Sequence, residues 1–239
     1  MPTCNPQVDI IIPHFGITQE LTDKCLACLR SIREHSASGY RVIFVDNASP
    51  DEQLDQVLAE LHNHPHVLIR NRVNTGFIKA TNSGIALSTA PLVVLLNNDT
   101  RVAPLWLEKL AAPLRGNIGV SGPRTTTPNS WQGRVKEVSG TVRILPAGNM
   151  LAFFCVMFRS EVLKAVGPLD EDFGMGLGDD DWYCLQVQRK GWQLALVTDL
   201  VIAHDHRSTF HTLHTPEEVK AQQAQAMELF HGKVRGEVQ

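Results

Sequence analysis

The sequence predicts an α/β protein built on a doubly wound, mostly parallel sheet. Four short apolar segments, each typical of a strand, alternate with amphipathic helical segments in the first hundred residues. Crossovers of this length join parallel strands through right-handed connections. Polar residues directly follow three of the strands, at His14, at Asp46 and Asn47, and at 97–99. Because ligands of such sheets gather at the carboxyl ends of the strands, we expect a ligand cleft there.

The expected elements of the first half alternate regularly. Strands are expected at 8–12, 40–45, 66–70 and 92–96, and helices at about 18–35, 50–64 and 76–89. The second helix has the clearest signals, with Ser49 as N-cap, Pro50 at the first helical position and Glu52 completing a capping box. Pro65 ends its apolar stripe.

The second half is less regular, and we expect it to be a smaller mixed part of the same domain. Helices are expected at about 104–115, 160–166 and 180–190, short strands between 135 and 158, and a strand at 193–197. A last helix, 215–232, has Thr215 as N-cap, Glu218 at the third position and Gly232 past its end. No internal repeat or linker divides residues 1–239, so a single domain is expected.

The composition excludes several classes of protein. The formal charge of -3 argues against a nucleic-acid binder, which is usually basic on one face. No apolar run reaches the roughly 18 residues of a transmembrane segment, and the N-terminus has no signal-peptide pattern. Five irregularly spaced cysteines do not form a disulfide framework, and Cys25 and Cys28 lie on a helical apolar stripe typical of a core. A cytoplasmic protein is expected.

Asp99 is a candidate metal ligand. The apolar strand 92–96 stops abruptly at Asn97, Asn98 and Asp99. A carboxylate at the mouth of a parallel sheet suits Mg²⁺ and similar ions, which one or two carboxylates often hold together with substrate phosphates. The alternative is that Asn98 and Asp99 form a simple turn or helix cap.

Three consecutive acids, Asp179, Asp180 and Asp181, open the helix expected at 180–190. The helix dipole favours one or two anions at this end. The third adds like-charge repulsion, which raises a carboxyl pKa toward the range that a general base at neutral pH requires. Capping of the helix is the alternative interpretation.

Two further segments offer weaker signals. His204 and His206 alternate onto one face if the strand before them continues, so either can bind metal, with His211 or His214 completing a zinc site. Solvated loop histidines are the alternative. Gly76 opens a helix after a polar loop, and its free N–H groups, with Arg70, Arg72 and Lys79 nearby, suit a diphosphate.

Six segments together resemble the family 2 glycosyltransferases, which have the GT-A fold, and within them a rhamnosyltransferase-like branch. These are IIIPHFG, VIFVDNASPD, NTGFIKATNSGI, LLNNDT, MFRSEVLKAVGPLDEDF and GDDDWYCLQVQRKGW. They follow the family's order from about residue 8 to 210. LLNNDT is similar to the family's metal motif, and GDDDW to the segment that holds its general base.

The resemblance implies metal-dependent, inverting transfer of a sugar from a nucleotide-diphosphate sugar to a hydroxyl. The donor nucleotide would be UDP, dTDP or GDP, the ion Mn²⁺ or Mg²⁺, and the acceptor a glycan, a lipid-linked sugar or a protein. Residues from about 8 to 102 would bind the donor, and those from about 103 to 210 the acceptor. A cytoplasmic enzyme, or one attached peripherally to a membrane, is implied.

The resemblance also implies roles for individual residues. The donor would contact Pro13, His14, Asp46, Asn47, Asn74, Gly76, Phe77, Asn97 and Asn98. The metal would be held by Asp99 with either His204 or His206. Asp180 falls on the general base, and Asp179 and Asp181 remain alternatives.

The chain departs from the family's pattern at three places. His14, Phe15 and Gly16 replace an aromatic and a polar residue, Asp179 replaces a Glu, and Trp182 replaces a second Asp. Two rival functions remain open. A sugar-phosphate nucleotidyltransferase would need a glycine-rich basic loop after the first strand, which 13–20 does not supply. A non-catalytic sugar-nucleotide-binding module would be expected to lose the base, yet all three acids are present.

Overall fold

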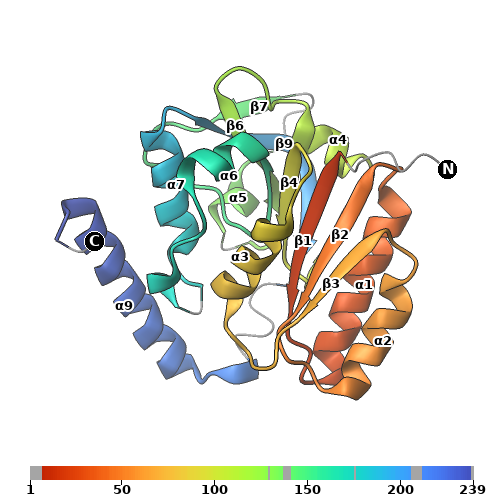
Figure 1. Ribbon diagram of the computed structural model, residues 1–239. Coiled ribbons are helices and arrows are strands. Elements are labelled where there is room, and N and C mark those ends of the chain that lie inside the picture. The colour runs from red at the N-terminus through yellow and green to blue at the C-terminus, as the bar shows by residue number, and fades with distance from the viewer. Residues whose placement is uncertain (1–6, 129, 137–140, 175, 206–211, 238–239) are drawn as a thin grey trace.

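The computed structural model describes residues 7–128, 130–136, 141–174, 176–205 and 212–237. In this part of the chain nine strands form one twisted sheet that lies between two layers of helices (Figure 1). The strand order is β3-β2-β1-β4-β8-β6-β9-β5, and β7 pairs with β9 outside this path. The sheet is therefore continuous across the two expected halves.

The first four strands form the expected parallel unit. Their bounds are β1 Val8–His14, β2 Tyr40–Asp46, β3 His66–Arg70 and β4 Leu92–Leu96. β1 lies between β2 and β4 and is parallel to both. His14 is in register with Asp46, and Asp46 in register with Arg70, so the carboxyl ends of these strands share one edge.

The remaining strands extend the sheet in mixed directions. They are β5 Thr100–Arg101, β6 Ile118–Thr125, β7 Val142–Ile144, β8 Cys155–Arg159 and β9 Gln193–His204. β8 is antiparallel to β4 and β6, and β9 is parallel to β6. The expected end of the last strand at residue 197 was wrong. After a register shift β9 continues along β6 and then pairs with β5, so its backbone keeps partners beyond polar Thr198 and Asp199.

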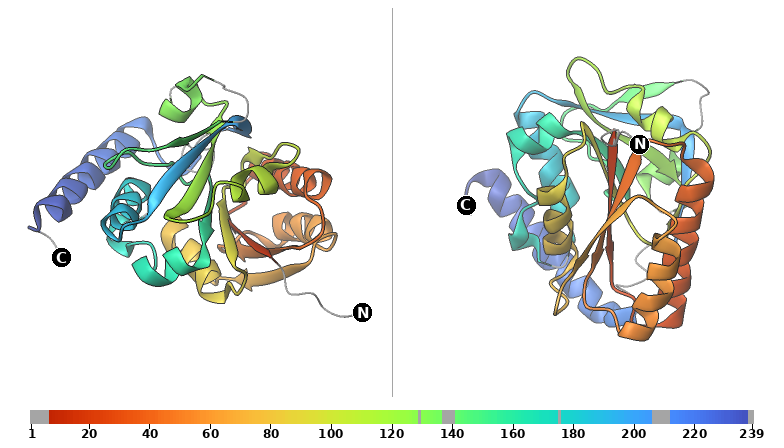
Figure 2. Two further views of the ribbon diagram at one scale, coloured as in Figure 1. Left: turned by 90° about the horizontal axis from the view of Figure 1, so that it is seen from above. Right: turned by 45° about the vertical axis from the view of Figure 1, so that its right-hand side comes forward.

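Helices cover both faces of the sheet (Figure 2). On one face lie α1 Gln19–His35, α2 Asp51–Leu61 and α4 Trp106–Ala111, and on the other α3 Phe77–Leu87, α6 Ser160–Val166 and α7 Asp179–Arg189. The short elements are α5 Trp131–Arg134 and η1 Glu171–Phe173, and the last helix is α9 Pro216–Arg235. Fully buried Phe44 and Trp106 belong to one core and Phe158 to the other.

Several helix ends differ from those expected. α2 begins at Asp51, Pro50 is its N-cap, and no side chain caps it. Ser49 is not the cap, because its hydroxyl instead accepts a hydrogen bond from the backbone N–H of Gly16 at 2.8 Å. α4 begins only at Trp106, since Leu105 has a left-handed backbone with φ of 61°.

The capping box of α9 between Thr215 and Glu218 is confirmed, but Gly232 does not end the helix. The helix continues to Arg235, and Gly236 ends it with φ of 75°. Cys25 and Cys28 are both fully buried, as their apolar stripe predicts. None of the described helices is both long enough and apolar enough to cross a bilayer.

Helix α3 packs closely on β1 through Gly84. A Cβ at this position would lie 2.4 Å from Cγ2 of Ile11. Overpacking of this kind costs about 1–3 kcal/mol, and alanine regains roughly 0.5–1 kcal/mol in a helix. We therefore expect Gly84→Ala to lower the free energy of unfolding by about 1 kcal/mol in urea titrations.

Ser83→Ala, on the same helix, is the matched control, and its effect should stay within about 0.5 kcal/mol. The penalty of Gly84→Ala should disappear in an Ile11→Ala background, because the colliding methyl is gone. An equal penalty in both backgrounds would contradict this account of the α3–β1 contact.

Candidate active site

One cavity of about 590 Å³ opens at the carboxyl edge of the sheet. Its walls come from the ends of β1 and β4, the loops after β2 and β3, the first turn of α7, the end of β9, and α9. Of the described residues to which the family resemblance gives a role, all except Asp46 line this cavity. His206 and His211 lie outside the described residues.

Asn47 organises the two loops expected to face the donor. Its amide N–H donates to Oδ1 of Asn74 at 2.6 Å, and its Oδ1 accepts from the backbone N–H of Thr75 at 3.0 Å. Asn74 in turn accepts from the N–H of Gly76 at 2.9 Å. Gly76 has φ of 85°, a left-handed value that favours glycine, and it turns the chain into α3. The N-terminus of α3 and Phe77 are thereby set at the cavity wall.

Asp46 lies behind this wall and does not line the cavity. It is fully buried, accepts a hydrogen bond from the N–H of Ser49 and lies 3.4 Å from Nε of Arg70. These contacts hold the loop after β2. Arg70, Arg72 and Lys79 do not line the cavity either, and Arg70 and Lys79 pair with Asp51 and Glu171.

His14 and Asn98 form the floor between β1 and β4. The amide of Asn98 lies 2.7 Å from Nδ1 of His14, and burial lowers the pKa of His14 to about 4. The imidazole is therefore neutral at physiological pH, and its Nδ1 accepts the hydrogen bond. A Cβ on Gly16 would lie 2.5 Å from Nε2 of His14. A side chain at residue 16 would therefore collide with the imidazole of His14.

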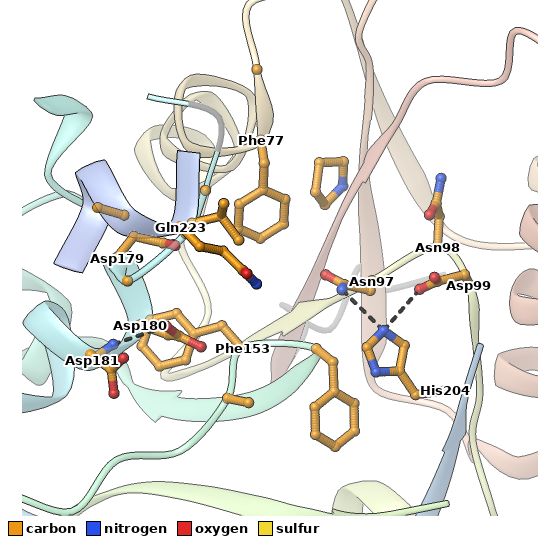
Figure 3. A pocket seen from close by; sticks show the side chains of 18 of the residues that line it. Phe77, Asn97, Asn98, Asp99, Phe153, Asp179, Asp180, Asp181, His204 and Gln223 are labelled. Atoms are coloured by element: carbon orange, nitrogen blue, oxygen red, sulfur yellow. Dashed lines mark hydrogen bonds and ion pairs between the residues drawn. The ribbon is translucent and has the colours of Figure 1, made fainter. Parts of the chain in front are cut away.

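Asp99 and His204 meet on one side of the cavity (Figure 3). Oδ1 of Asp99 lies 3.2 Å from Nε2 of His204, and both side chains are almost fully buried. Antiparallel pairing of β5 with β9 sets Thr100 opposite His204 and so brings the two residues together. The ring of Phe154 stacks on His204 at 4.9 Å with an interplanar angle of 12°, which fixes the imidazole.

These residues suit a hard cation, but they supply fewer ligands than such an ion requires. Asp99 offers a carboxylate, His204 an imidazole, and Asn97 a buried Oδ1 without a hydrogen-bond partner among the described residues. The described residues contain no cluster of three or more His, Cys, Asp or Glu that could hold an ion, so they form no zinc site with His214. An ion held by few protein groups needs phosphate and water as further ligands, which suits Mn²⁺ or Mg²⁺.

The three acids occupy the first turn of α7 on the opposite side. Gly178, with φ of 77°, precedes the helix and sets its direction. Burial raises the pKa of Asp179 to about 6, and the charge of Asp181 adds to the effect. Burial, with the charges of Asp179 and Asp181, raises the pKa of Asp180 well above its usual value. The group titrates as a unit and offers a base near neutral pH.

The orientation of the acids differs. Asp180 extends toward the side of the cavity that carries Asn97 and His204, whereas the Asp181 carboxylate extends in another direction (Figure 3). The backbone N–H of Asp181 donates to Oδ1 of Asp180 at 3.0 Å, which fixes that carboxylate. Asp180 is therefore the acid best placed to face the Asp99–His204 pair.

Sequence reasoning missed the wall made by α9. Gln223, Ala226 and Met227 line the cavity, as does Leu213 just before the helix. The capping box predicted the helix itself, but nothing in residues 215–232 indicates where it docks. The i, i+3, i+4 spacing of the three residues was the one available signal for a shared face.

Comparisons with known proteins show which family the chain resembles. The profile of glycosyl transferase family 2 matches residues 9–167. Glycosyltransferase AglE of Haloferax volcanii is 24% identical over 216 residues, which are 87% of this chain and 69% of that protein. The pre-mycofactocin glycosyltransferase of Mycobacterium tuberculosis is 28% identical over 192 residues, which are 72% of this chain but only 39% of that protein.

Solved structures share the fold at low sequence identity. The mannosyltransferase PcManGT of Pyrobaculum calidifontis, in complex with GDP-Man and Mn²⁺, has a TM-score of 0.73 at 17% identity, covering 98% of this chain and 65% of that one. S. aureus TarS 1–349 in complex with UDP-GlcNAc has a TM-score of 0.68 at 15% identity, covering 94% and 65%. These neighbours have the GT-A fold that the sequence predicted. The chain therefore belongs to glycosyl transferase family 2 and is a glycosyltransferase.

Proposed function

We propose that the protein is a metal-dependent, inverting glycosyltransferase that moves a sugar from a nucleotide-diphosphate sugar to an acceptor hydroxyl. One observation carries the proposal. Asp180 lies across a single cavity from Asp99 and His204 (Figure 3). A base and a diphosphate site that face each other across one space are what a direct displacement requires.

The donor occupies the wall formed by β1, β2 and α3. Pro13, His14 and Asn47 lie on the nucleoside side, and Asn74, Gly76 and Phe77 present the N-terminus of α3. Free N–H groups at a helix N-terminus favour an anion such as a diphosphate. The structural neighbours bound to GDP-Man and UDP-GlcNAc support a donor of this class, with UDP, GDP or dTDP as its nucleotide.

Asp99 and His204 are the residues that would hold a Mn²⁺ or Mg²⁺ ion, and Asn97 and Asn98 line the same side of the cavity. When bound, the ion acts as a Lewis acid toward the leaving diphosphate. Phe154 and the β5–β9 pairing keep the two ligands oriented before any ion binds. Mn²⁺ in the complex of the mannosyltransferase neighbour supports this assignment.

Asp180 is the general base. As the acceptor oxygen forms a bond to the anomeric carbon, the bond from that carbon to the diphosphate oxygen breaks and the hydroxyl proton passes to Asp180. A single displacement inverts the anomeric configuration. Burial of Asp180 raises the pKa of the base, and the negative charges of Asp179 and Asp181 raise it further. The acceptor is a hydroxyl of a glycan, a lipid-linked sugar or a protein.

Asp180→Asn removes the proton acceptor and keeps the size of the side chain. Transfer should fall by about 10²–10⁴-fold, because general-base catalysis contributes that much, while donor affinity by calorimetry stays unchanged. Asp55→Asn, an exposed carboxylate on α2, is the control. Full activity in Asp180→Asn, with loss in Asp179→Asn or Asp181→Asn instead, would move the base to that residue.

Asp99→Ala removes the carboxylate of the ion site. Nucleotide-sugar affinity measured with Mn²⁺ should fall about tenfold or more, since a charge-assisted contact contributes roughly 1.5–3 kcal/mol. In EDTA, wild type and variant should bind the donor equally weakly. Equal affinities of wild type and variant in Mn²⁺ would remove Asp99 from the site.

The pH dependence of transfer follows from the raised pKa values of the acids. A base acts only when deprotonated, so kcat should fall as the pH is lowered through the pKa of Asp180, which burial and the charges of Asp179 and Asp181 raise well above its usual value. An ordinary carboxylate, with a pKa near 4, would lose activity only at much lower pH. A pH profile of kcat that stays flat until the pH approaches the ordinary carboxylate range near 4 would contradict this expectation.

A further inference from the structure

Helix α9 closes the side of the cavity that carries the acids. It starts near the carboxyl edge of the sheet and passes along α7 (Figures 1 and 2). Gln223, Ala226 and Met227 face the cavity from one side of the helix. The carboxamide of Gln223 extends into the space between Phe77 and Phe153, beside Asp179 and Asp180 (Figure 3).

α9 lies on the opposite side of the cavity from the Asp99–His204 pair, and within the described residues Gln223 adjoins the donor wall only at Phe77 (Figure 3). The groups assigned to the ion, Asn97 to Asp99 with His204, lie on the far side of the cavity (Figure 3). A molecule that brings a hydroxyl to Asp180 from the near side therefore lies against α9. The wall that it meets combines an amide that both donates and accepts hydrogen bonds with the aromatic ring of Phe153 and the apolar side chain of Met227.

We propose that α9 forms the acceptor subsite and that this subsite takes a sugar ring. Lys233 is the residue that positions α9. A sugar ring has a hydroxyl edge and an apolar C–H face, and the Gln223 amide and the apolar wall match these two surfaces. The proposal rests on the proposed function, because it takes Asp180 as the base.

Lys233 holds α9 against the rest of the protein through a group of contacts, here called the clasp, with Asp170, Asp172 and Trp182. Its Nζ lies 2.9 Å from Asp170 and 2.8 Å from Asp172, the residues that precede and form η1, and only 4% of its side chain is exposed. It also lies 5.9 Å from the ring centre of Trp182, against whose ring Phe230 of α9 packs edge-on. Trp182 directly follows Asp181, so the clasp connects α9 to the turn that carries the base.

Trp182 stands where the family resemblance leads one to expect a second aspartate. Its contacts with Phe230, Lys233 and Arg189 give the substitution a physical reason. The indole provides the docking surface for α9, which a carboxylate could not provide next to Asp181. Lys233 itself touches no substrate and acts through the placement of Gln223 and Met227.

The test uses the whole protein with p-nitrophenyl glycosides of glucose, galactose, mannose and N-acetylglucosamine as acceptors. UDP-, GDP- and dTDP-sugars with Mn²⁺ serve as donors. Lys233→Met and Gln223→Ala should each raise the acceptor KM about tenfold, which corresponds to the loss of one good hydrogen bond. Donor Kd and the rate of donor hydrolysis by water should stay within about twofold of wild type.

Three controls distinguish a residue that positions α9 from a residue that contacts the acceptor. Lys220→Met, an exposed lysine of the same helix, should leave every value unchanged. Lys233→Arg should keep most of the acceptor affinity. Hydrogen exchange of α9 should accelerate in Lys233→Met but not in Gln223→Ala. If Lys233→Met fails to fold by circular dichroism, Asp172→Asn removes one acceptor of the same clasp.

The outcomes distinguish this proposal from the proposed function. Unchanged acceptor KM in both variants, or an equal loss of donor affinity, would overturn the acceptor subsite. Wild-type protein that binds and hydrolyses a donor but glycosylates none of the glycosides would overturn the sugar acceptor and leave the proposed function standing. Wild-type protein that binds no nucleotide-sugar in Mn²⁺ would overturn the proposed function itself.

Discussion

The antiparallel pairing of β5 with β9 brings Asp99 within 3.2 Å of His204, and the rest of the site is arranged around this contact. The two residues are over a hundred positions apart, and β9 must extend twelve residues to reach β5. The parallel strands β1 to β4 then set the donor wall on one side of the pair. The sheet thus fixes the distance between groups that no local sequence pattern connects, with Phe154 stacked on His204 to prevent its rotation.

The acids of α7 illustrate a different constraint. Three adjacent carboxylates, one of them buried, oppose folding through repulsion and lost hydration. The helix N-terminus and the N–H of Asp181 offset part of this cost, and the raised pKa values show that the remainder persists. Such a group is unfavourable for stability but suits a base near neutral pH. Groups that an active site needs often lower the stability of the protein in this way.

The sequence predicted the first half of the fold well because its signals are local. The apolar run 92–96 matches β4 at both ends, and the polar residues after the strands, Asp46 excepted, line the cavity as expected. The misses depend on tertiary contacts. No residue near Thr198 indicates that β9 continues and pairs with β5. No residue near Ser49 indicates that its hydroxyl accepts a hydrogen bond from Gly16. The sequence around Asp46 likewise does not show that Arg70 lies beside it. Docking of α9 requires Trp182, Asp170 and Asp172 together, which only the folded chain assembles.

The departures from the family's pattern are better understood in pairs than one by one. His14 occupies the space that a side chain at residue 16 would need, so glycine at this position suits the histidine. Trp182 removes a carboxylate from an already crowded turn and gives α9 a surface on which Phe230 and Lys233 pack. In both cases the residue that departs from the pattern has a packing partner in this chain, Gly16 for His14 and Phe230 for Trp182. Both departures therefore have a local packing reason, while Asp99 and Asp180, the groups assigned to the reaction, line the same cavity from opposite sides.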